Sequence, residues 1–173
     1  MPNGRRASVA IIACYASAAT LDTLPSPRGA HLCRIAPEEL WVVAARNEGS
    51  AILSAVAAYL TTHEPSALAI DQSDGWVVRS LFGDDALTML AQLCVFRFPD
   101  MRPEFVQGSV AGAPAKVLLL FGSVHVFVPY PLRHYLDSRL LDVGGAASQV
   151  GLEMSSFSFG TPNTSDMPTQ QEI

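Results

Sequence analysis

The chain has 173 residues, of which 49% are hydrophobic and only 16% charged, with a net charge of -5 and a pI near 5.2. This length suits one domain with its own core and is too short for two ordinary ones. The net negative charge and the scattered arginines lack the basic surface that a nucleic-acid-binding protein needs. No apolar stretch approaches the roughly 20 residues of a membrane span, so neither nucleic acid nor a membrane is expected as a partner.

The N-terminal segment combines a basic start with an apolar run. Two arginines precede the sequence ASVAIIACYASAA, which has the small-residue ending of a secretory leader. The run is rich in alanine and contains Tyr15 and Ser17 where a leader has leucines. We therefore expect residues 1–30 to form an N-terminal strand or a partner-contacting arm. The alternative that residues 1–20 are a cleaved leader stays open.

The cysteines and histidines form no metal-binding or disulfide pattern. Cys14, Cys33 and Cys94 are odd in number and contain no CxxC pair, which argues against a disulfide framework and a zinc knuckle. Buried free thiols in a reducing compartment are the simplest interpretation, so a cytoplasmic protein is expected. The four histidines show no ligand spacing, and His125 alternates with two valines so that it should face away from them.

The first ordered half is expected to contain a buried strand and a helix. The segment EELWVVAA at 38–45 lacks alternation, which is typical of a central strand covered on both faces. Ser50 is predicted to cap a helix that ends before Pro65 and lies against this strand. The apolar stripe of that helix comprises Ile52, Leu53, Val56, Tyr59 and Leu60.

The segment AIDQSDGWVVRSLFGDDA at 69–86 holds the most polar candidates. Its aspartates could supply a general acid and base or bind a hard cation: Asp71, Asp74, Asp84 and Asp85. They fall at a strand end and a helix start, where aspartate is favoured for turns and caps. Asp71 and Ser73 are therefore predicted to hold a turn through side-chain to backbone hydrogen bonds, and Asp84 to cap a helix that continues to Cys94.

The C-terminal half is predicted to contain a hairpin, a helix and a tail. In AKVLLLFGSVHVFV at 115–128, Gly122 followed by serine suits a primed turn. Pro131 should begin a helix that Gly144-Gly145 ends. Residues 144–173 are polar and rich in turn formers, so they are predicted to be a flexible or partner-bound tail.

In chain order, these elements predict an α+β fold. We expect one largely antiparallel sheet with helices packed on one side, in a single domain over residues 31–143. The chain lacks both the G-x-G-x-x-G and the G-x-x-x-x-G-K-[ST] phosphate loops, and Ser73 lacks the G-x-S-x-G elbow of a serine nucleophile. No catalytic, cofactor-binding or metal-binding residue is therefore predicted on this chain.

Four segments, taken in order, are similar to those of one known family. IAPEELWVVA at 35–44 resembles a Gly-Pro-Asp-Glu-Trp-Leu strand start, and AIDQSDGWVVRSLFGDDA resembles a Val-x-Asp-x-Ser strand followed by Gly-Pro-x-Ala, through Asp71, Ser73 and Gly83. FVQGSVAGAPAKVLLL resembles a Phe-x-x-Gly segment, and VHVFVPYPLRHYLDSRL resembles a closing strand, Val-Pro and helix through Pro129. The chain thus resembles the gamma subunits of heterotetrameric sarcosine oxidases, within the aminomethyltransferase-like, folate-binding group.

The resemblance implies a non-catalytic gamma-type subunit. The heterotetramer would demethylate sarcosine oxidatively to glycine, and pass a one-carbon unit to tetrahydrofolate or release it as formaldehyde. Its alpha, beta and delta subunits would hold FAD, FMN, NAD, tetrahydrofolate and zinc, with no cofactor on this chain. Aminomethyltransferases bear an acidic pair in the hairpin region, whereas this chain has AGAPAKVLL, with Lys116 and no carboxylate, so the one-carbon transfer residue is absent.

The subunit interface is predicted from residue type alone. Aromatic residues and arginine are enriched in interface hot spots, so four side chains are expected to contact the large subunit: Trp76, Arg79, Phe157 and Phe159. Two alternatives stay open. One is the equivalent subunit of an N-methylglutamate dehydrogenase or another N-methyl amino acid demethylase, and the other is a stand-alone folate-binding one-carbon protein. The first alternative cannot be separated by sequence, because the substrate would bind another chain.

Overall fold

Two antiparallel sheets form the frame of the molecule. The computed structural model describes residues 9–83, 85–95, 97–144 and 151–153. The first sheet has the order β2-β3-β1-β4, with β1 Val9–Tyr15, β2 Ala30–Ala36, β3 Glu39–Ala45 and β4 Leu68–Asp71. The second has the order β6-β7-β8-β5-β9, with β5 Trp76–Phe82, β6 Glu104–Val110, β7 Ala113–Leu120, β8 Ser123–Pro129 and β9 Gly151–Glu153.

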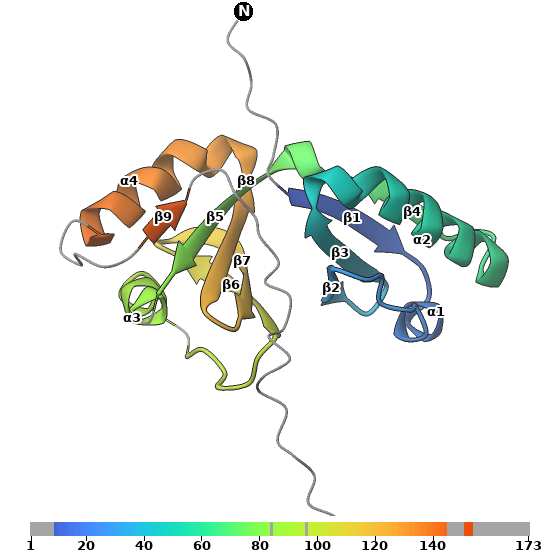
Figure 1. Ribbon diagram of the computed structural model, residues 1–173, viewed down its shortest axis with the longest axis horizontal. Helices are drawn as coiled ribbons and strands as arrows, with labels where there is room; N and C mark the ends of the chain where they lie inside the picture. The colour runs from blue at the N-terminus through green and yellow to red at the C-terminus, as the bar shows by residue number, and fades with distance from the viewer. Residues whose placement is uncertain (1–8, 84, 96, 145–150, 154–173) are drawn as a thin grey trace, which may run out of the picture.

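The helices lie in two groups, one beside each sheet (Figure 1). The α-helices are α1 Ala18–Asp22, α2 Gly49–His63, α3 Ala86–Ala91 and α4 Arg133–Gly144. Three short 3₁₀ turns are η1 Arg46–Glu48, η2 Ser73–Gly75 and η3 Tyr130–Leu132. None of the helices in the described ranges is long and apolar enough to cross a membrane.

Three apolar clusters show how the layers pack. One joins α1 and α2 to a face of the first sheet and includes Leu21, Ile12, Val42, Val56 and Leu60. A second joins α3 and α4 to a face of the second sheet and includes Leu81, Leu90, Val117, Leu136 and Leu140. The third, which we call the inter-sheet core, comprises Val9, Ile11, Ala13, Cys33, Trp41, Val43, Val78, Leu118 and Phe127. The two sheets therefore pack face to face, with helices on both outer sides.

Strand β3 shows the side-chain alternation behind this arrangement. Its Leu40 and Val42 point to the helix side, whereas Trp41 and Val43 enter the inter-sheet core. Because successive side chains of a strand point to opposite faces, a strand between two layers is apolar throughout. The prediction of a central, doubly covered strand at 38–45 is confirmed, since β3 pairs with both β2 and β1.

The α+β class is confirmed, but the expectation of a single sheet is wrong. An apolar strand face can be covered by a helix or by a second sheet, and the hydrophobic pattern does not distinguish the two. The folded unit also extends past both expected limits, residues 31 and 143. Strand β1 lies between β3 and β4, and β9 pairs with β5.

Two helix starts differ from the prediction. Helix α2 begins at Gly49, so Ser50 lies in its first turn, and the N-cap is Glu48 without a side-chain hydrogen bond. A Cβ on Gly49 would stand 2.7 Å from the Cβ of Ala10, so glycine lets the helix start approach β1 closely. The expected N-cap Asp84 lies outside the described residues, and the structure has Asp85 at the N-cap of α3.

Helix α3 is shorter than expected. It ends at Ala91, and Cys94 lies beyond it in an isolated bridge with Val110.

The hairpin of β7 and β8 is confirmed, because Leu120 pairs with Ser123.

The turns differ from expectation in type and position. Among the described residues, Ala111 is the only non-glycine with a positive φ, so Phe121 in the β7–β8 turn does not adopt a primed conformation. Primed geometry occurs instead at Ala111 (φ 53) and Gly112 (φ 84), between the paired residues Val110 and Ala113. Helix α4 starts at Arg133, after Pro131 in the preceding 3₁₀ turn.

Candidate functional site

The Asp71–Ser73 turn ties the end of β4 to β1. The Ser73 hydroxyl accepts a hydrogen bond from the Ile11 amide at 2.9 Å and donates to Asp71. The Ser73 amide also donates to Asp71 Oδ1 at 2.9 Å. Ser73 is completely buried, so its hydroxyl holds the sheet together and faces no open site.

The charge of Asp71 is stabilised by this turn. Burial acts to raise the pKa of Asp71, but the hydrogen bonds from Ser73 and the positive charge of Arg46 outweigh it and lower the pKa below its ordinary value. The carboxylate therefore stays ionised near neutral pH and is a poor general acid. In the described part of the chain, no group of three or more His, Cys, Asp or Glu side chains could hold a metal ion.

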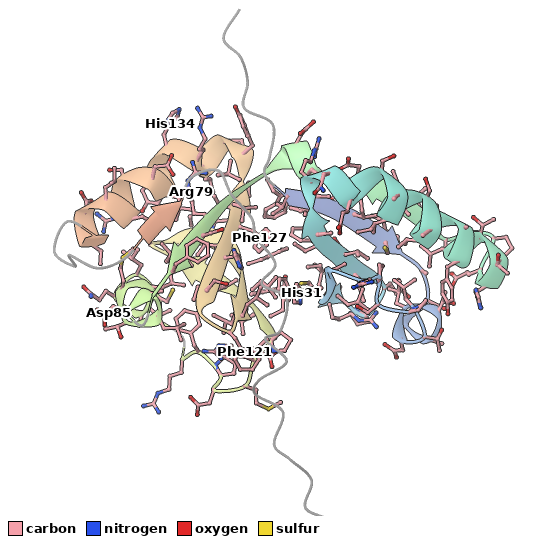
Figure 2. All side chains as sticks on the ribbon, viewed as in Figure 1. His31, Arg79, Asp85, Phe121, Phe127 and His134 are labelled. Atoms are coloured by element: carbon pink, nitrogen blue, oxygen red, sulfur yellow. The ribbon has the colours of Figure 1, made fainter. Side chains whose placement is uncertain are left out.

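Arg79 is an internal residue whose burial and hydrogen bonds within this chain argue against the expected subunit contact. Its side chain is 8% exposed, and its Nε and Nη2 donate to the two oxygens of Asp137 on α4 at 2.5 and 2.8 Å. Nη1 donates to the Val78 carbonyl at 3.1 Å. The guanidinium thus fixes α4 onto β5, and Figure 2 shows Arg79 beside α4.

His125 forms a polar group inside the second sheet. Its Nδ1 lies 2.8 Å from Ser80 Oγ and its Nε2 lies 3.1 Å from Ser123 Oγ. As predicted, it faces away from Val124 and Val126, which belong to the cluster between the second sheet and helices α3 and α4. Burial lowers the pKa of His125 to about 4, and His31 adds to that effect. His125 is therefore neutral in the folded protein at physiological pH.

We expect His125 to make the folded chain less stable as the pH falls from about 6.5 to about 4. In this window the unfolded state binds a proton at the ordinary pKa of 6.5, whereas the folded state does not. The loss from this residue is about 3 kcal/mol when complete, and it is absent above pH 7. Urea unfolding across this range measures it, and His125→Gln should flatten the curve by that amount. An unchanged pH dependence in the variant would contradict the prediction.

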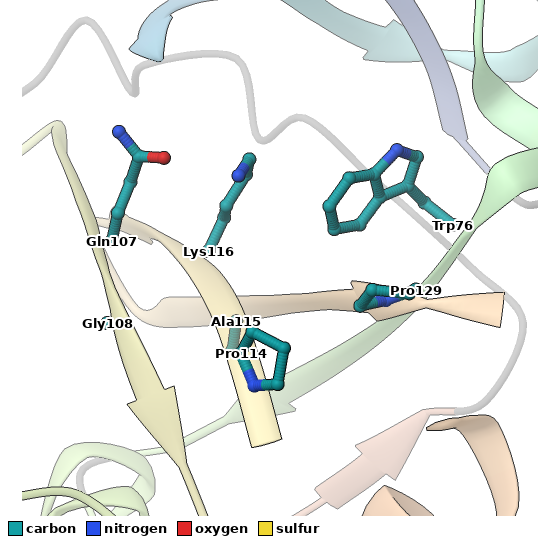
Figure 3. A pocket seen from close by; sticks show the side chains of 7 residues that line it. All are labelled: Trp76, Gln107, Gly108, Pro114, Ala115, Lys116 and Pro129. Atoms are coloured by element: carbon teal, nitrogen blue, oxygen red, sulfur yellow. The ribbon is translucent and has the colours of Figure 1, made fainter. Parts of the chain in front are cut away.

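A small pocket opens at the edge of the inter-sheet core. It measures about 230 Å³ and is lined by Trp76, Gln107, Gly108, Pro114, Ala115, Lys116 and Pro129 (Figure 3). Gln107 and Lys116 are paired residues of β6 and β7, so they stand side by side on one face. The neighbours of Lys116, Ala115 and Val117, point to the cluster under α3 and α4. Lys116 therefore points to the other face, toward the inter-sheet core, as Leu118 does.

The Lys116 ammonium lies close to the rings of both tryptophans of the chain. Its Nζ lies 5.0 Å from the ring centre of Trp41 and 5.1 Å from that of Trp76. The two indoles meet edge to face at 4.6 Å. The sequence contains no other lysine and no other tryptophan, so its one primary side-chain amine and both its indoles gather here.

A polar rim adjoins the two indole rings. Glu39 Oε1 accepts hydrogen bonds from Trp41 Nε1 at 3.2 Å and from the Tyr15 hydroxyl at 3.4 Å. Gln72 Nε2 donates to the Tyr15 hydroxyl at 2.8 Å. Burial lowers the pKa of Lys116, while the charge of Glu39 acts in the opposite direction. Indole faces also favour the ammonium form, so the site presents a positive charge in an apolar setting.

The thiols are unsuited to chemistry at the ordinary pH of a cell. Burial raises the pKa of Cys14 and Cys33 to about 12 and that of Cys94 to about 11. Since the thiolate is the reactive form, all three stay protonated. Cys14 and Cys33 are buried, as expected, whereas Cys94 is only partly so.

The residues of the family motif occupy separate places. Pro129 lines the pocket beside Trp76. Gly83 follows the last residue of β5 and has a φ of +99°, a conformation that favours glycine. Asp71 and Ser73 hold the turn after β4, and Phe157 and Phe159 lie outside the described residues. The pocket itself was not predicted, because its lining residues come from four strands, β5 to β8, and are spread over residues 76–129 of the sequence.

Comparison with known proteins finds a similar fold among solved structures. No family model and no curated protein matches the sequence. The fold is similar to a chain in the structure of heterotetrameric sarcosine oxidase from Corynebacterium sp. U-96 in complex with pyrrole 2-carboxylate, with a TM-score of 0.69 and 17% sequence identity. The match covers 85% of this chain and 85% of that chain, so the two have similar lengths. At this identity the likeness shows a shared fold.

Proposed function

We propose that this chain is a small, non-catalytic subunit of gamma type in a heterotetrameric flavoenzyme that demethylates sarcosine. The carrying observation is the shared fold over 85% of this chain and of a chain from heterotetrameric sarcosine oxidase. The match spans most of both chains, which supports the correspondence. The ordered family motifs, which include Asp71, Ser73, Gly83 and Pro129, support the gamma assignment independently of the fold.

The use of the polar side chains supports a structural role. Ser73, Arg79 and His125 are buried, and each contacts neighbouring polar groups of the same chain. Lys116 occupies the hairpin segment in which aminomethyltransferases carry carboxylates. In this proposal the alpha, beta and delta subunits hold FAD, FMN, NAD, tetrahydrofolate and zinc, and the chemistry occurs on them.

Isolation of the native assembly tests the proposal. A tag on this chain should recover a yellow complex whose absorption spectrum shows bound flavin, together with a much larger subunit identified by mass spectrometry. A colourless monomer would contradict it. The pocket, at about 230 Å³, falls below the roughly 300–1,000 Å³ of ordinary ligand sites, so the isolated full chain should not bind tetrahydrofolate saturably. Saturable binding would favour the stand-alone folate protein instead.

Trp76→Ala is expected to weaken assembly without changing the flavin spectrum of the complex that still forms. Trp76 is half-buried at the pocket and is the one predicted contact residue that the structure leaves partly accessible. Loss of a hot-spot aromatic weakens binding roughly 30-fold or more. Co-purification at equal expression measures the effect, with Phe121→Ala as a control, because Phe121 is an exposed aromatic in the β7–β8 turn. Full assembly of Trp76→Ala would remove Trp76 from the interface.

A further inference from the structure

The ammonium of Lys116 has donors that the described chain does not use. The ion pairs of the described residues are made by arginines alone, and the contacts of Lys116 Nζ are the indole rings of Trp41 and Trp76. Glu39, the carboxylate whose charge reaches Lys116, accepts hydrogen bonds from Trp41 and Tyr15 through its Oε1 and is in none of the ion pairs of the described residues. An ammonium has three N–H donors, and here they border an open pocket.

The pocket walls define what could satisfy those donors. Trp76, Pro114, Ala115 and Pro129 supply apolar surface, and Lys116 is the one cationic group among the lining residues. Gln107 donates one N–H to the Ile35 carbonyl at 2.8 Å, and its amide has a second donor. A single cation in a mostly apolar pocket is complementary to a ligand group that has one negative charge and an apolar hydrocarbon part. It does not match a phosphate, which carries more charge and requires more donors.

We propose that this pocket binds a carboxylate group, which pairs with Lys116 Nζ while its carbon body packs on Trp76 and the prolines. The volume of about 230 Å³ suits one acidic side chain or a small monocarboxylic acid. Exclusion of water by the indoles strengthens the charge-assisted hydrogen bond. The carboxylate has two possible sources, a free small acid or an Asp or Glu side chain of a partner subunit. The second source rests on the proposed function.

The first arm of the test titrates the full chain with propionate at constant ionic strength. Both tryptophans flank Lys116, so the whole tryptophan emission reports this site. We expect a saturable change that Lys116→Met weakens roughly tenfold or more and that Lys116→Arg, which keeps the charge, largely retains. Circular dichroism and thermal melting check that both variants fold. Equal titrations of wild type and Lys116→Met would overturn a small-acid site.

A second measurement avoids substitution altogether. An amine-reactive ester can modify only the N-terminus and Lys116 side chain, because the chain has no other lysine. Mass spectrometry of peptides from the digested chain should show that propionate slows modification of Lys116 at least severalfold while modification of the N-terminus proceeds unchanged. Equal rates at both amines with and without propionate would overturn binding of a free acid.

The third arm uses the assembled protein and separates the two sources. If a partner supplies the carboxylate, Lys116→Met should reduce co-purification of that partner roughly tenfold, and assembly should protect Lys116 from the ester. Propionate binding with unimpaired assembly assigns the site to a free small acid. Neither propionate binding nor an effect on assembly would overturn the proposal. Failure of wild type to recover a flavoenzyme would overturn the proposed function alone, since the propionate titration needs no partner.

Discussion

Replacement of Asp137 by alanine should destabilise the folded chain by about 3–5 kcal/mol, because Arg79 would keep its charge in the interior without a counter-ion. The pair is largely shielded from water, with side-chain exposures of 8% for Arg79 and 22% for Asp137. Its two parallel hydrogen bonds form the bidentate geometry that fits guanidinium to carboxylate best. Equilibrium unfolding in urea measures the loss, provided that the transition stays two-state.

The same helix offers a matched control. Asp142 pairs with Arg139 at 3.2 Å on the surface of α4, and such exposed pairs contribute about 0–1 kcal/mol. Asp142→Ala should therefore leave the free energy of unfolding nearly unchanged. Replacing both Arg79 and Asp137 by apolar residues should restore much of the stability that Asp137→Ala loses. If Asp137→Ala cost no more than Asp142→Ala, the guanidinium would be solvated and α4 would not depend on it.

Phe127→Ala is the second substitution with a large expected effect, about 3–5 kcal/mol. Phe127 is fully buried in the inter-sheet core and meets Trp41 of the other sheet edge to face, with ring centres 6.3 Å apart. The variant removes a large side chain that both sheets share, and the surrounding strands cannot collapse into the space. Urea unfolding gives the change in stability, and tryptophan emission reports the altered packing around Trp41.

Two milder substitutions bracket this prediction. Phe127→Leu keeps an apolar side chain and should cost clearly less than Phe127→Ala. Phe121→Ala removes the same kind of side chain from a position that is 82% exposed, and should change stability by less than about 0.5 kcal/mol. A small cost for Phe127→Ala would mean that the two sheets are not packed through this residue.

Local sequence patterns predicted individual elements better than their assembly. The run around Trp41 showed that both faces of its strand are covered, which β3 confirms. The pattern does not reveal that a second sheet covers one of those faces, because the partner Phe127 lies more than 80 residues away and a helix would demand the same apolar residues. Turn chemistry at Asp71 and Ser73 was predictable because it involves neighbours in sequence.

The candidate site was partly predictable. Trp76 was selected by residue type alone as an expected subunit contact, and in the structure it lines the pocket. Arg79 was misassigned, since residue type cannot show that Asp137, 58 positions later, faces it. The sequence singled out Lys116 only because its segment lacks the carboxylates that aminomethyltransferases carry there. The contact of Lys116 with both Trp41 and Trp76 depends on the packing of two sheets, for which a single sequence holds no local signal.

The division of the strands between the sheets has a consequence for the order in which the chain folds. The strands of the first sheet lie within residues 9–71, and those described for the second lie within residues 76–153. A ribosome therefore releases the whole first sheet before β8 has been made. The inner face of that sheet stays uncovered until Phe127 is available to pack on it. Strand β5 cannot pair until then either, because Trp76 pairs with Pro129 on β8. Closing the chain segment between β5 and β8 is the step expected to limit the folding rate.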